Sequence, residues 1–175
     1  EEELTVSEAQ LAKIDVELKA MVCDHELAPY VMSMPGVGIG VAAVFLAYVG
    51  DGHRFSSPAQ VANYCGLVPR IDCSGDTNKS GSITMEGCRA IRGTILQATW
   101  SLSRCKDGGR LKQKFLALTG RKGRTKSAVA IARRMVGMLW ILVTRKEFYS
   151  SVERATLERK FKYYGVKYEG WESAA

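Results

Sequence analysis

The chain has 175 residues, enough for one domain or one domain with an appendage, and its 46% hydrophobic content is far above that of disordered chains. Its five cysteines are scattered without a Cys-x-x-Cys pair and only two histidines accompany them, so a zinc site is excluded and free, mostly core-filling thiols are expected. The start is Glu-Glu-Glu and the longest apolar run, Met135 to Val143, is about half a membrane span, which predicts a soluble, cytoplasmic protein without a signal peptide.

The net charge of +7 is unevenly distributed along the chain. Residues 1–30 hold eight acidic and two basic side chains and sum to −6, whereas residues 66–134 hold four acidic and fifteen basic ones and sum to +11. An acidic start followed by a concentrated basic body favours a polyanionic partner, most simply nucleic acid. The plainer alternative is a solvated basic face.

The first predicted element is a helix in residues 1–28. The segment Thr5-Val6-Ser7-Glu8 has the pattern of a capping box, and apolar residues then follow heptad-like spacing at Leu11, Ile14, Leu18 and Met21. This spacing is typical of the end of a coiled coil.

The segment Met34-Pro35-Gly36-Val37-Gly38 stands between two helical patterns and resembles the hairpin of a helix-hairpin-helix element. Gly36 and Gly38 would let a phosphate approach the backbone, and the next helix would offer it free N–H groups. A plain tight turn that packs two core helices remains open as the alternative.

The later elements are also predicted to be helical. Expected helices cover about 41–49, 58–64, 86–104, 110–118, 126–145 and 152–164, and the stretch 66–83 is expected to be a loop. Because no sustained β pattern appears, we predict an all-α fold, a helical bundle with a helix-hairpin-helix-like element and a long serine-bearing loop. The main domain is expected at 29–150, between the helix of 1–28 and a C-terminal helix and tail at 151–175.

Ser74 is the candidate catalytic residue. It precedes Gly75 on the predicted loop and is followed by a helix that carries Arg89 and Arg92, an arrangement that suits attack on or contact with a phosphodiester. No histidine lies near it in sequence, so a hydrolase triad is unsupported. Asp72 and Asp76 flank it symmetrically, but aspartates in loops usually make turns, and no metal site is predicted.

The candidate nucleic-acid-binding residues are basic side chains of the body together with the two hairpin glycines. They are Gly36, Gly38, Arg70, Lys79, Arg89, Arg92, Arg110, Lys112, Arg121, Lys122 and Arg124.

Several of these motifs follow one another in a single order and spacing. They are Met34 to Gly38, Phe55 with Ala59 to Tyr64, Gly66-Leu67-Val68-Pro69, Ser74-Gly75, Ile83-Thr84, Gly87, Arg92, Trp100 and Val129 to Arg133. Together they resemble the C-terminal domain of the insertion-sequence one-ten family of transposases, the bridge-RNA-guided recombinases. The resemblance covers about residues 30–145, and the opening helix looks like the tail of the coiled coil that joins that family's two domains.

The resemblance implies a function that the residues alone do not. In that family an RNase-H-like N-terminal domain binds a divalent metal, Mg²⁺, through four acidic residues, and the C-terminal domain supplies a serine that maps onto Ser74. The implied reaction is DNA strand cleavage and exchange through a phosphoserine link, with active sites shared between subunits. The implied partners are DNA, guide RNA and further copies of the protein, with no membrane and a cytoplasmic, nucleoid-associated location.

The chain departs from the family pattern beside Ser74. Asp76-Thr77 stands where Gly-Lys is common, Met85 where lysine is usual, and Cys88 where Asn or Asp often follows the glycine. These departures predict weaker phosphate contact. No RNase-H-like pattern is present either, so we expect no cofactor in this part and a fragment that binds nucleic acid without cutting it.

Two other functions remain as alternatives. One is a non-catalytic helix-hairpin-helix-type nucleic-acid-binding module. The other is an oligomerisation domain built on the apolar 128–143 segment and the N-terminal heptads.

Overall fold

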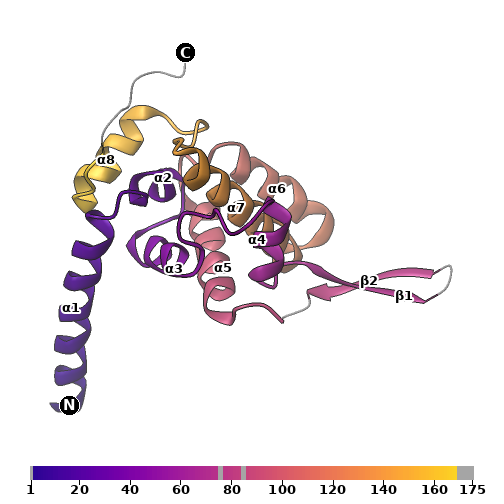
Figure 1. Cartoon of the computed structure of the whole chain (residues 1–175), viewed down its shortest axis with the longest axis horizontal. Coiled ribbons are helices and arrows are strands. Elements are labelled where there is room, and N and C mark those ends of the chain that lie inside the picture. The colour runs from indigo at the N-terminus through magenta and orange to yellow at the C-terminus, as the bar shows by residue number, and fades with distance from the viewer. Residues whose placement is uncertain (1, 75–76, 84–85, 169–175) are drawn as a thin grey trace.

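The computed structural model describes residues 2–74, 77–83 and 86–168, with the backbone alone described at Glu2 and in the stretches 70–74 and 77–82. Within these ranges the chain forms eight helices and one two-stranded sheet (Figure 1). The elements are α1 (Glu2–Cys23), α2 (Ala28–Ser33), α3 (Ile39–Val49), α4 (Pro58–Tyr64), β1 (Pro69–Ser74), β2 (Thr77–Ile83), α5 (Arg89–Arg104), α6 (Gly109–Lys122), α7 (Arg124–Arg145) and α8 (Arg154–Tyr164). The prediction of a predominantly helical protein is confirmed.

Helix α7 is the central element of the helical body. It packs against α2, α4, α5 and α6, and its side chains Ile131, Met135 and Leu139 are fully buried. The helix is long enough to cross a membrane, and its most apolar stretch of 18 residues has a mean hydropathy of 1.5. However, 56% of that stretch is buried inside the protein, which is the pattern of a core helix. Helix α7 therefore buries one face in the core, while Arg133 and Arg134 lie exposed on the other.

The turn between α2 and α3, residues 34–38, packs inward. Gly36 has a φ of +81°, and a Cβ placed on it would lie 2.5 Å from the carbonyl oxygen of Ala98 in α5. A Cβ on Gly38 would lie 3.3 Å from the hydroxyl of Tyr164 in α8. The turn thus lies against α5 and α8, and close packing is a sufficient reason for its first glycine.

Lys160 fastens α8 to the same turn. Its Nζ donates hydrogen bonds to the carbonyl oxygens of Met32 and Met34, the latter at 3.0 Å, at the C-terminal end of α2. Burial lowers the pKa of this ammonium group to about 8. A lysine that satisfies the last carbonyls of a helix stabilises that helix end.

The stretch around Ser74 is a β-ribbon, and the prediction of a long loop there is wrong. Strands β1 and β2 pair antiparallel, with Pro69 opposite Ile83 and Ser74 opposite Thr77 (Figure 1). We call β1 and β2 the serine ribbon. It projects away from the helical body, so no core imposes the alternation of apolar and polar residues by which strands are recognised in a sequence.

At the root of the serine ribbon, the glycine before β1 packs directly against the glycine after β2. Gly66 has a φ of +64°, and a Cβ placed on Gly87 would lie 2.1 Å from the Gly66 nitrogen. The Cys88 N–H donates to the Tyr64 carbonyl at 3.1 Å, and Arg92 Nη1 donates to the Gly87 carbonyl at 3.2 Å. The two chain segments that enter and leave the ribbon are therefore held in direct backbone contact.

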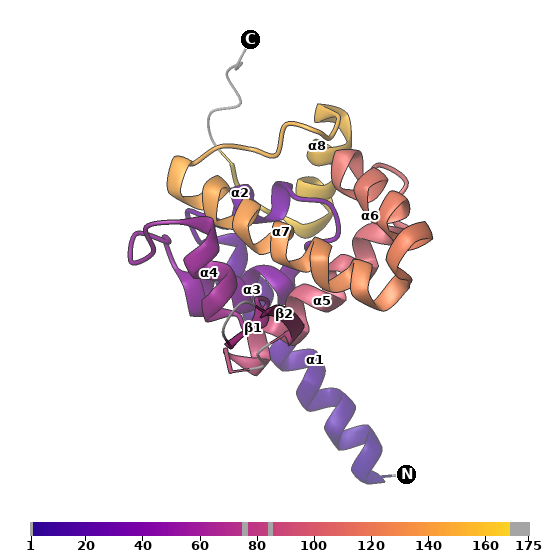
Figure 2. The same cartoon turned by 90° about the vertical axis from the view of Figure 1, so that its right-hand side faces the viewer.

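Helix α1 also projects from the body (Figures 1 and 2). Its last residues, Val22 and Cys23, are buried, whereas most of its length is exposed.

Candidate nucleic-acid interface

A groove of about 1960 Å³ runs along the open face of α7. Figure 2 shows α7 crossing the body between α4 and α6, the two helices that flank this groove. Seven of its lining side chains are basic: Arg110, Lys114, Lys122, Lys126, Arg133, Arg134 and Lys146. Lys146 pairs with Glu26. We call this groove the basic groove. Among the described residues that line it, Glu147 is the one acidic side chain, so the groove suits an anionic ligand.

The floor of the groove follows from the periodicity of α7. Lys126, Ala130, Arg133, Gly137 and Ile141 recur at steps of three or four residues and line the groove, so they share one face of the helix. The opposite face is the apolar one that forms the core. The floor is consequently mixed, with cations separated by small or apolar side chains.

Close contact between two helices forms one wall. A Cβ placed on Gly137 would lie 3.1 Å from Cβ of Pro58, the first residue of α4. The Ser57 hydroxyl accepts a hydrogen bond from the Gln60 N–H at 3.4 Å and caps α4. The absence of a side chain at Gly137 thus lets the start of α4 approach α7.

Helix α6 and its corner with α7 form the other wall. Leu111 and Phe115 anchor α6 in the core, while Arg110 and Lys114 line the groove. The chain turns at Gly123, which has a φ of +76°. Just after this corner, the guanidinium carbon of Arg124 lies 5.8 Å from the centre of the Trp100 ring.

The sequence candidates do not all lie at the groove. Arg110 and Lys122 line it, and Arg121 and Arg124 are exposed at the adjoining corner. Lys112 instead donates from Nζ to the Cys105 carbonyl at 2.5 Å and so completes the end of α5.

The other candidates lie away from the groove lining. Arg92 is engaged at the ribbon root, and Arg89 is exposed at the start of α5. Gly36 and Gly38 lie against α5 and α8. The side chains of Arg70, Ser74 and Lys79 are outside the described part of the structure.

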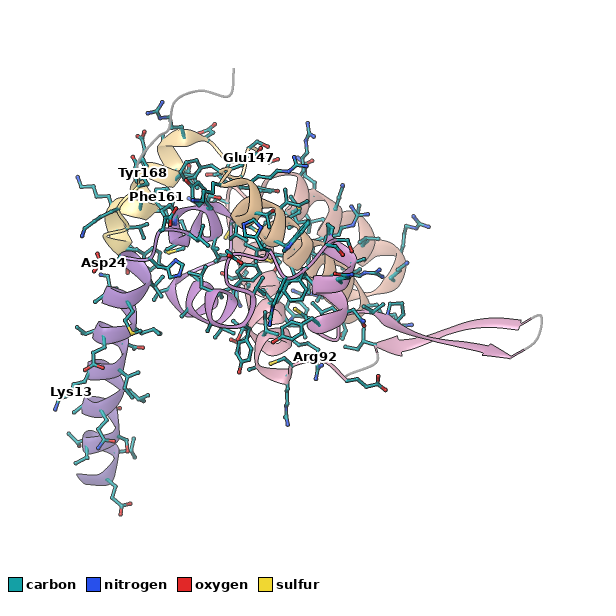
Figure 3. The ribbon with its side chains drawn as sticks, in the orientation of Figure 1. Lys13, Asp24, Arg92, Glu147, Phe161 and Tyr168 are labelled. Atoms are coloured by element: carbon teal, nitrogen blue, oxygen red, sulfur yellow. The ribbon has the colours of Figure 1, made fainter. Side chains whose placement is uncertain are left out.

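Ser74 lies at the far end of the serine ribbon. It is five positions along the strand from Pro69, which at about 3.4 Å per residue corresponds to about 17 Å. Pro69 and Ile83, at the ribbon root, line the basic groove, whereas Arg92 lies near the root on the helical body (Figure 3). The ribbon therefore carries Ser74 away from the start of α5, where Arg89 and Arg92 lie. That at least one of Arg70, Arg89 and Arg92 lies within reach of a phosphate at Ser74 stays a prediction, because the side chains of Arg70 and Ser74 are outside the described part of the structure.

Sequence reasoning did not single out five basic groove residues: Lys114, Lys126, Arg133, Arg134 and Lys146. A periodicity signal was present, because Lys126 and Arg133 are seven residues apart and therefore share a face of a helix. The apolar run that begins at Met135 marks the same helix as a core element, so its basic face was not recognised as a binding surface.

Two thiols near the ribbon root differ in their electrostatic environment. Burial raises the pKa of the Cys65 thiol to about 12, as expected of a core-filling cysteine. The backbone N–H of Ile91, at the start of α5, lowers the pKa of the Cys88 thiol.

No cluster of three or more His, Cys, Asp or Glu side chains suitable for a metal ion occurs in the described ranges. The divalent metal implied by the family resemblance therefore finds no fitting ligand set among these residues.

Comparison with known proteins agrees with the pattern of motifs. A model of the family described as Transposase IS116/IS110/IS902 matches residues 28–116. The transposase for insertion sequence element IS1111A of Coxiella burnetii is 33% identical over 149 residues, covering 84% of this chain and 41% of that protein. The insertion element IS110 uncharacterized 43.6 kDa protein of Streptomyces coelicolor is 28% identical over 155 residues, covering 89% and 38%.

A third relative is named for the inversion of a gene. The pilin gene-inverting protein of Moraxella lacunata is 30% identical over 129 residues, covering 70% of this chain and 39% of that protein. The chain thus spans about two fifths of the length of these relatives. Since the family model covers more than half of the chain, the chain belongs to the IS116/IS110/IS902 family of transposases.

Proposed function

We propose that this chain is the nucleic-acid-binding, serine-bearing part of a DNA transposase or recombinase. The observation that supports this most directly is the continuity of the basic groove with the root of the serine ribbon, through Pro69 and Ile83. A strand held in the groove would run toward the element that carries Ser74.

The groove would hold the nucleic acid through its phosphates. The cations of the basic groove would neutralise several backbone charges and release counterions, which would make binding strong at low salt and weak at high salt. The small and apolar residues between them, such as Ala130 and Ile141, leave room for sugar edges. Contacts of this kind position a strand without reading its sequence, so selection of a target would fall to another component, for which guide RNA is the proposal.

Ser74 would act as the nucleophile. Its hydroxyl oxygen would form a bond to phosphorus, its proton would pass to a base, and the bond from phosphorus to a deoxyribose oxygen would break. With the ribbon projecting from the body, Arg89 and Arg92 would stand away from the developing charge, Arg70 on β1 would be the nearer candidate cation, and the described residues hold no fitting metal ligands. The base and the balancing charge would come from another part of the whole protein or from another subunit, in keeping with a cytoplasmic, nucleoid-associated oligomer.

Paired substitutions test the groove. Arg133→Gln with Arg134→Gln removes two groove cations and should weaken binding of a DNA duplex or of RNA about ten- to thirtyfold at physiological salt. The slope of log affinity against log salt should fall by about 2, because about two phosphate contacts are lost. Fluorescence anisotropy over a salt series measures both quantities.

Arg104→Gln is the matched control for that experiment. Arg104 is an exposed arginine at the end of α5 and does not line the groove, so its replacement should change the affinity by less than about twofold. Equal losses in both variants, or no loss in the groove variant, would place the interface elsewhere.

The non-catalytic binding module remains the second candidate. The separation of Ser74 from Arg89 and Arg92 favours it, because an isolated serine hydroxyl is a weak nucleophile. The two candidates agree on the groove and differ only on Ser74.

A further inference from the structure

A second pocket, of about 420 Å³, lies between α8, the turn of residues 34–38 and the C-terminal end of α5. Helix α8 lies beside α2 at this place (Figure 1) and contributes Lys160 to the wall of the pocket. Lys160 is partly exposed, so a small solute that enters the pocket can reach its side chain.

The ammonium group of Lys160 is held by neutral partners. Its Nζ donates to the carbonyl oxygens of Met32 and Met34, which engages two of its three N–H groups. Among the described residues, no carboxylate acts on it as a counter-charge. Burial without such a charge favours the neutral amine, and it lowers the pKa of Lys160 to about 8.

Other titratable groups line the same pocket: Cys105, Lys106, Asp107 and Tyr164. Cys105 acts on the pKa of Lys160 in the opposite direction, because a thiolate there would favour the ammonium form, but desolvation is the larger effect. The carboxylate of Asp107 accepts a hydrogen bond from the Thr156 hydroxyl at 3.3 Å. The pocket therefore presents Lys160 as its desolvated nucleophile.

A desolvated lysine is reactive at neutral pH because much of it is present as the free amine. At about pH 7.5, a pKa of about 8 leaves about a quarter of Lys160 neutral, against about one in a thousand for an ordinary exposed lysine. The volume of the pocket is in the range that accommodates small ligands, so it has room for a small acylating agent beside the amine.

We propose that Lys160 is an acylation site, modified by small acyl phosphates that enter this pocket. Nζ would form a bond to the acyl carbon, the bond from that carbon to the phosphate oxygen would break, and the proton that the nitrogen loses would pass to the departing phosphate. The product is a neutral amide with a single N–H, so at most one of the hydrogen bonds to the end of α2 would remain. Acylation would thus release α8 from the turn. This inference does not depend on what the basic groove binds.

Acetyl phosphate is the probe, and Lys162, an exposed lysine of the same helix, is the internal control. The folded chain is incubated at about pH 7.5, and tandem mass spectrometry follows acetylation at both positions. Lys160 should react about tenfold faster than Lys162, since its larger neutral fraction is offset in part by the weaker nucleophilicity of a less basic group, as for thiols. Its rate should rise with pH and level off above about pH 8. In urea that unfolds the chain, the difference should disappear because burial creates it.

Lys160→Arg is the matched variant. Arginine keeps a cation in the pocket wall but does not offer a neutral amine. After treatment with acetyl phosphate, hydrogen exchange of the α8 amides should quicken about tenfold in the wild type, as expected for the loss of a hydrogen bond to a charged group. In the treated Lys160→Arg variant, which carries the same modifications elsewhere, exchange in α8 should stay unchanged.

Three results would each overturn the proposal. The first is acetylation of Lys160 in the folded chain that is no faster than that of Lys162. The second is a rate difference that persists in urea, because it would then come from the neighbouring sequence and not from the pocket. The third is equal exchange of the α8 amides in the treated wild type and the treated Lys160→Arg variant.

Discussion

Gly36 illustrates how one residue type can serve two different purposes. In the sequence, a glycine after proline between two helices suggests a site where a phosphate approaches the backbone. In the structure, a Cβ on Gly36 would lie 2.5 Å from the Ala98 carbonyl oxygen, so the close neighbour is α5. The alternative of a tight packing turn, left open by the sequence, accounts for this glycine without a ligand.

Gly36→Ala should destabilise the protein by about 2–4 kcal/mol, because the new methyl group meets backbone atoms at a φ of +81°. Urea unfolding followed by circular dichroism measures the change. Gly120→Ala is the control. Nothing lies within 4 Å of a Cβ at this position in α6, so that variant should gain about 0.5–1 kcal/mol from helix propensity. Equal stability of the two variants would contradict the packing described.

Lys160 gives the stability of the protein a dependence on pH. Its pKa in the folded protein, about 8, is below the ordinary value of 10.5, so between these values the unfolded chain binds more protons than the folded one. The free energy of unfolding of the wild type, relative to Lys160→Met, should therefore rise as the pH increases from about 8 to about 10.5. A difference that stays constant over this range in urea titrations would show that Lys160 is not buried.

Helix α7 performs two tasks with two faces. One face supplies the centre of the core through Ile131, Met135 and Leu139, and the other carries Lys126 and Arg133 into the basic groove. Charge changes on the two faces should consequently have different effects.

Leu139→Asp should unfold the body, with a loss of more than about 4 kcal/mol, because it places a carboxylate at a fully buried position. Arg134→Asp, on the exposed face of the same helix, should keep a cooperative thermal transition and lose nucleic-acid affinity instead. A soluble, cooperatively melting Leu139→Asp variant would contradict the arrangement of the core.

Some elements were predictable from the sequence because local patterns specify them. Ser57-Pro58 marks the start of α4, and the run from Met135 to Val143 identifies the core helix. The serine ribbon was missed because it does not lie on the core and so lacks an alternating pattern. The groove was also beyond sequence reasoning, since Arg110 and Arg133 meet at one surface only after α6 folds back along α7.

The whole molecule is a helical body with two projections, the serine ribbon and α1 (Figure 1). The groove belongs to the body, while Ser74 stands at the end of one projection. Binding and chemistry should therefore be separable by mutation.

In a full-length protein that contains this chain, Ser74→Ala should abolish recombination and leave nucleic-acid affinity within about twofold, because one hydroxyl contributes little to an interface of many phosphates. A plasmid recombination assay and an anisotropy titration measure the two effects. Ser80→Ala is the control, since Ser80 lies on the facing strand opposite Ile71. Normal recombination by Ser74→Ala would leave the non-catalytic binding module as the function.

The length of the serine ribbon amplifies small rotations at its base. With a radius of about 17 Å, a tilt of about 10° at Gly66 and Gly87 displaces Ser74 by about 3 Å. A misplacement of about 1 Å can slow a reaction about a hundredfold. Tight backbone contact at the base therefore cannot by itself aim the hydroxyl at a phosphorus atom. For the attack proposed for Ser74, the remaining accuracy would have to come from contacts made at the far end of the ribbon.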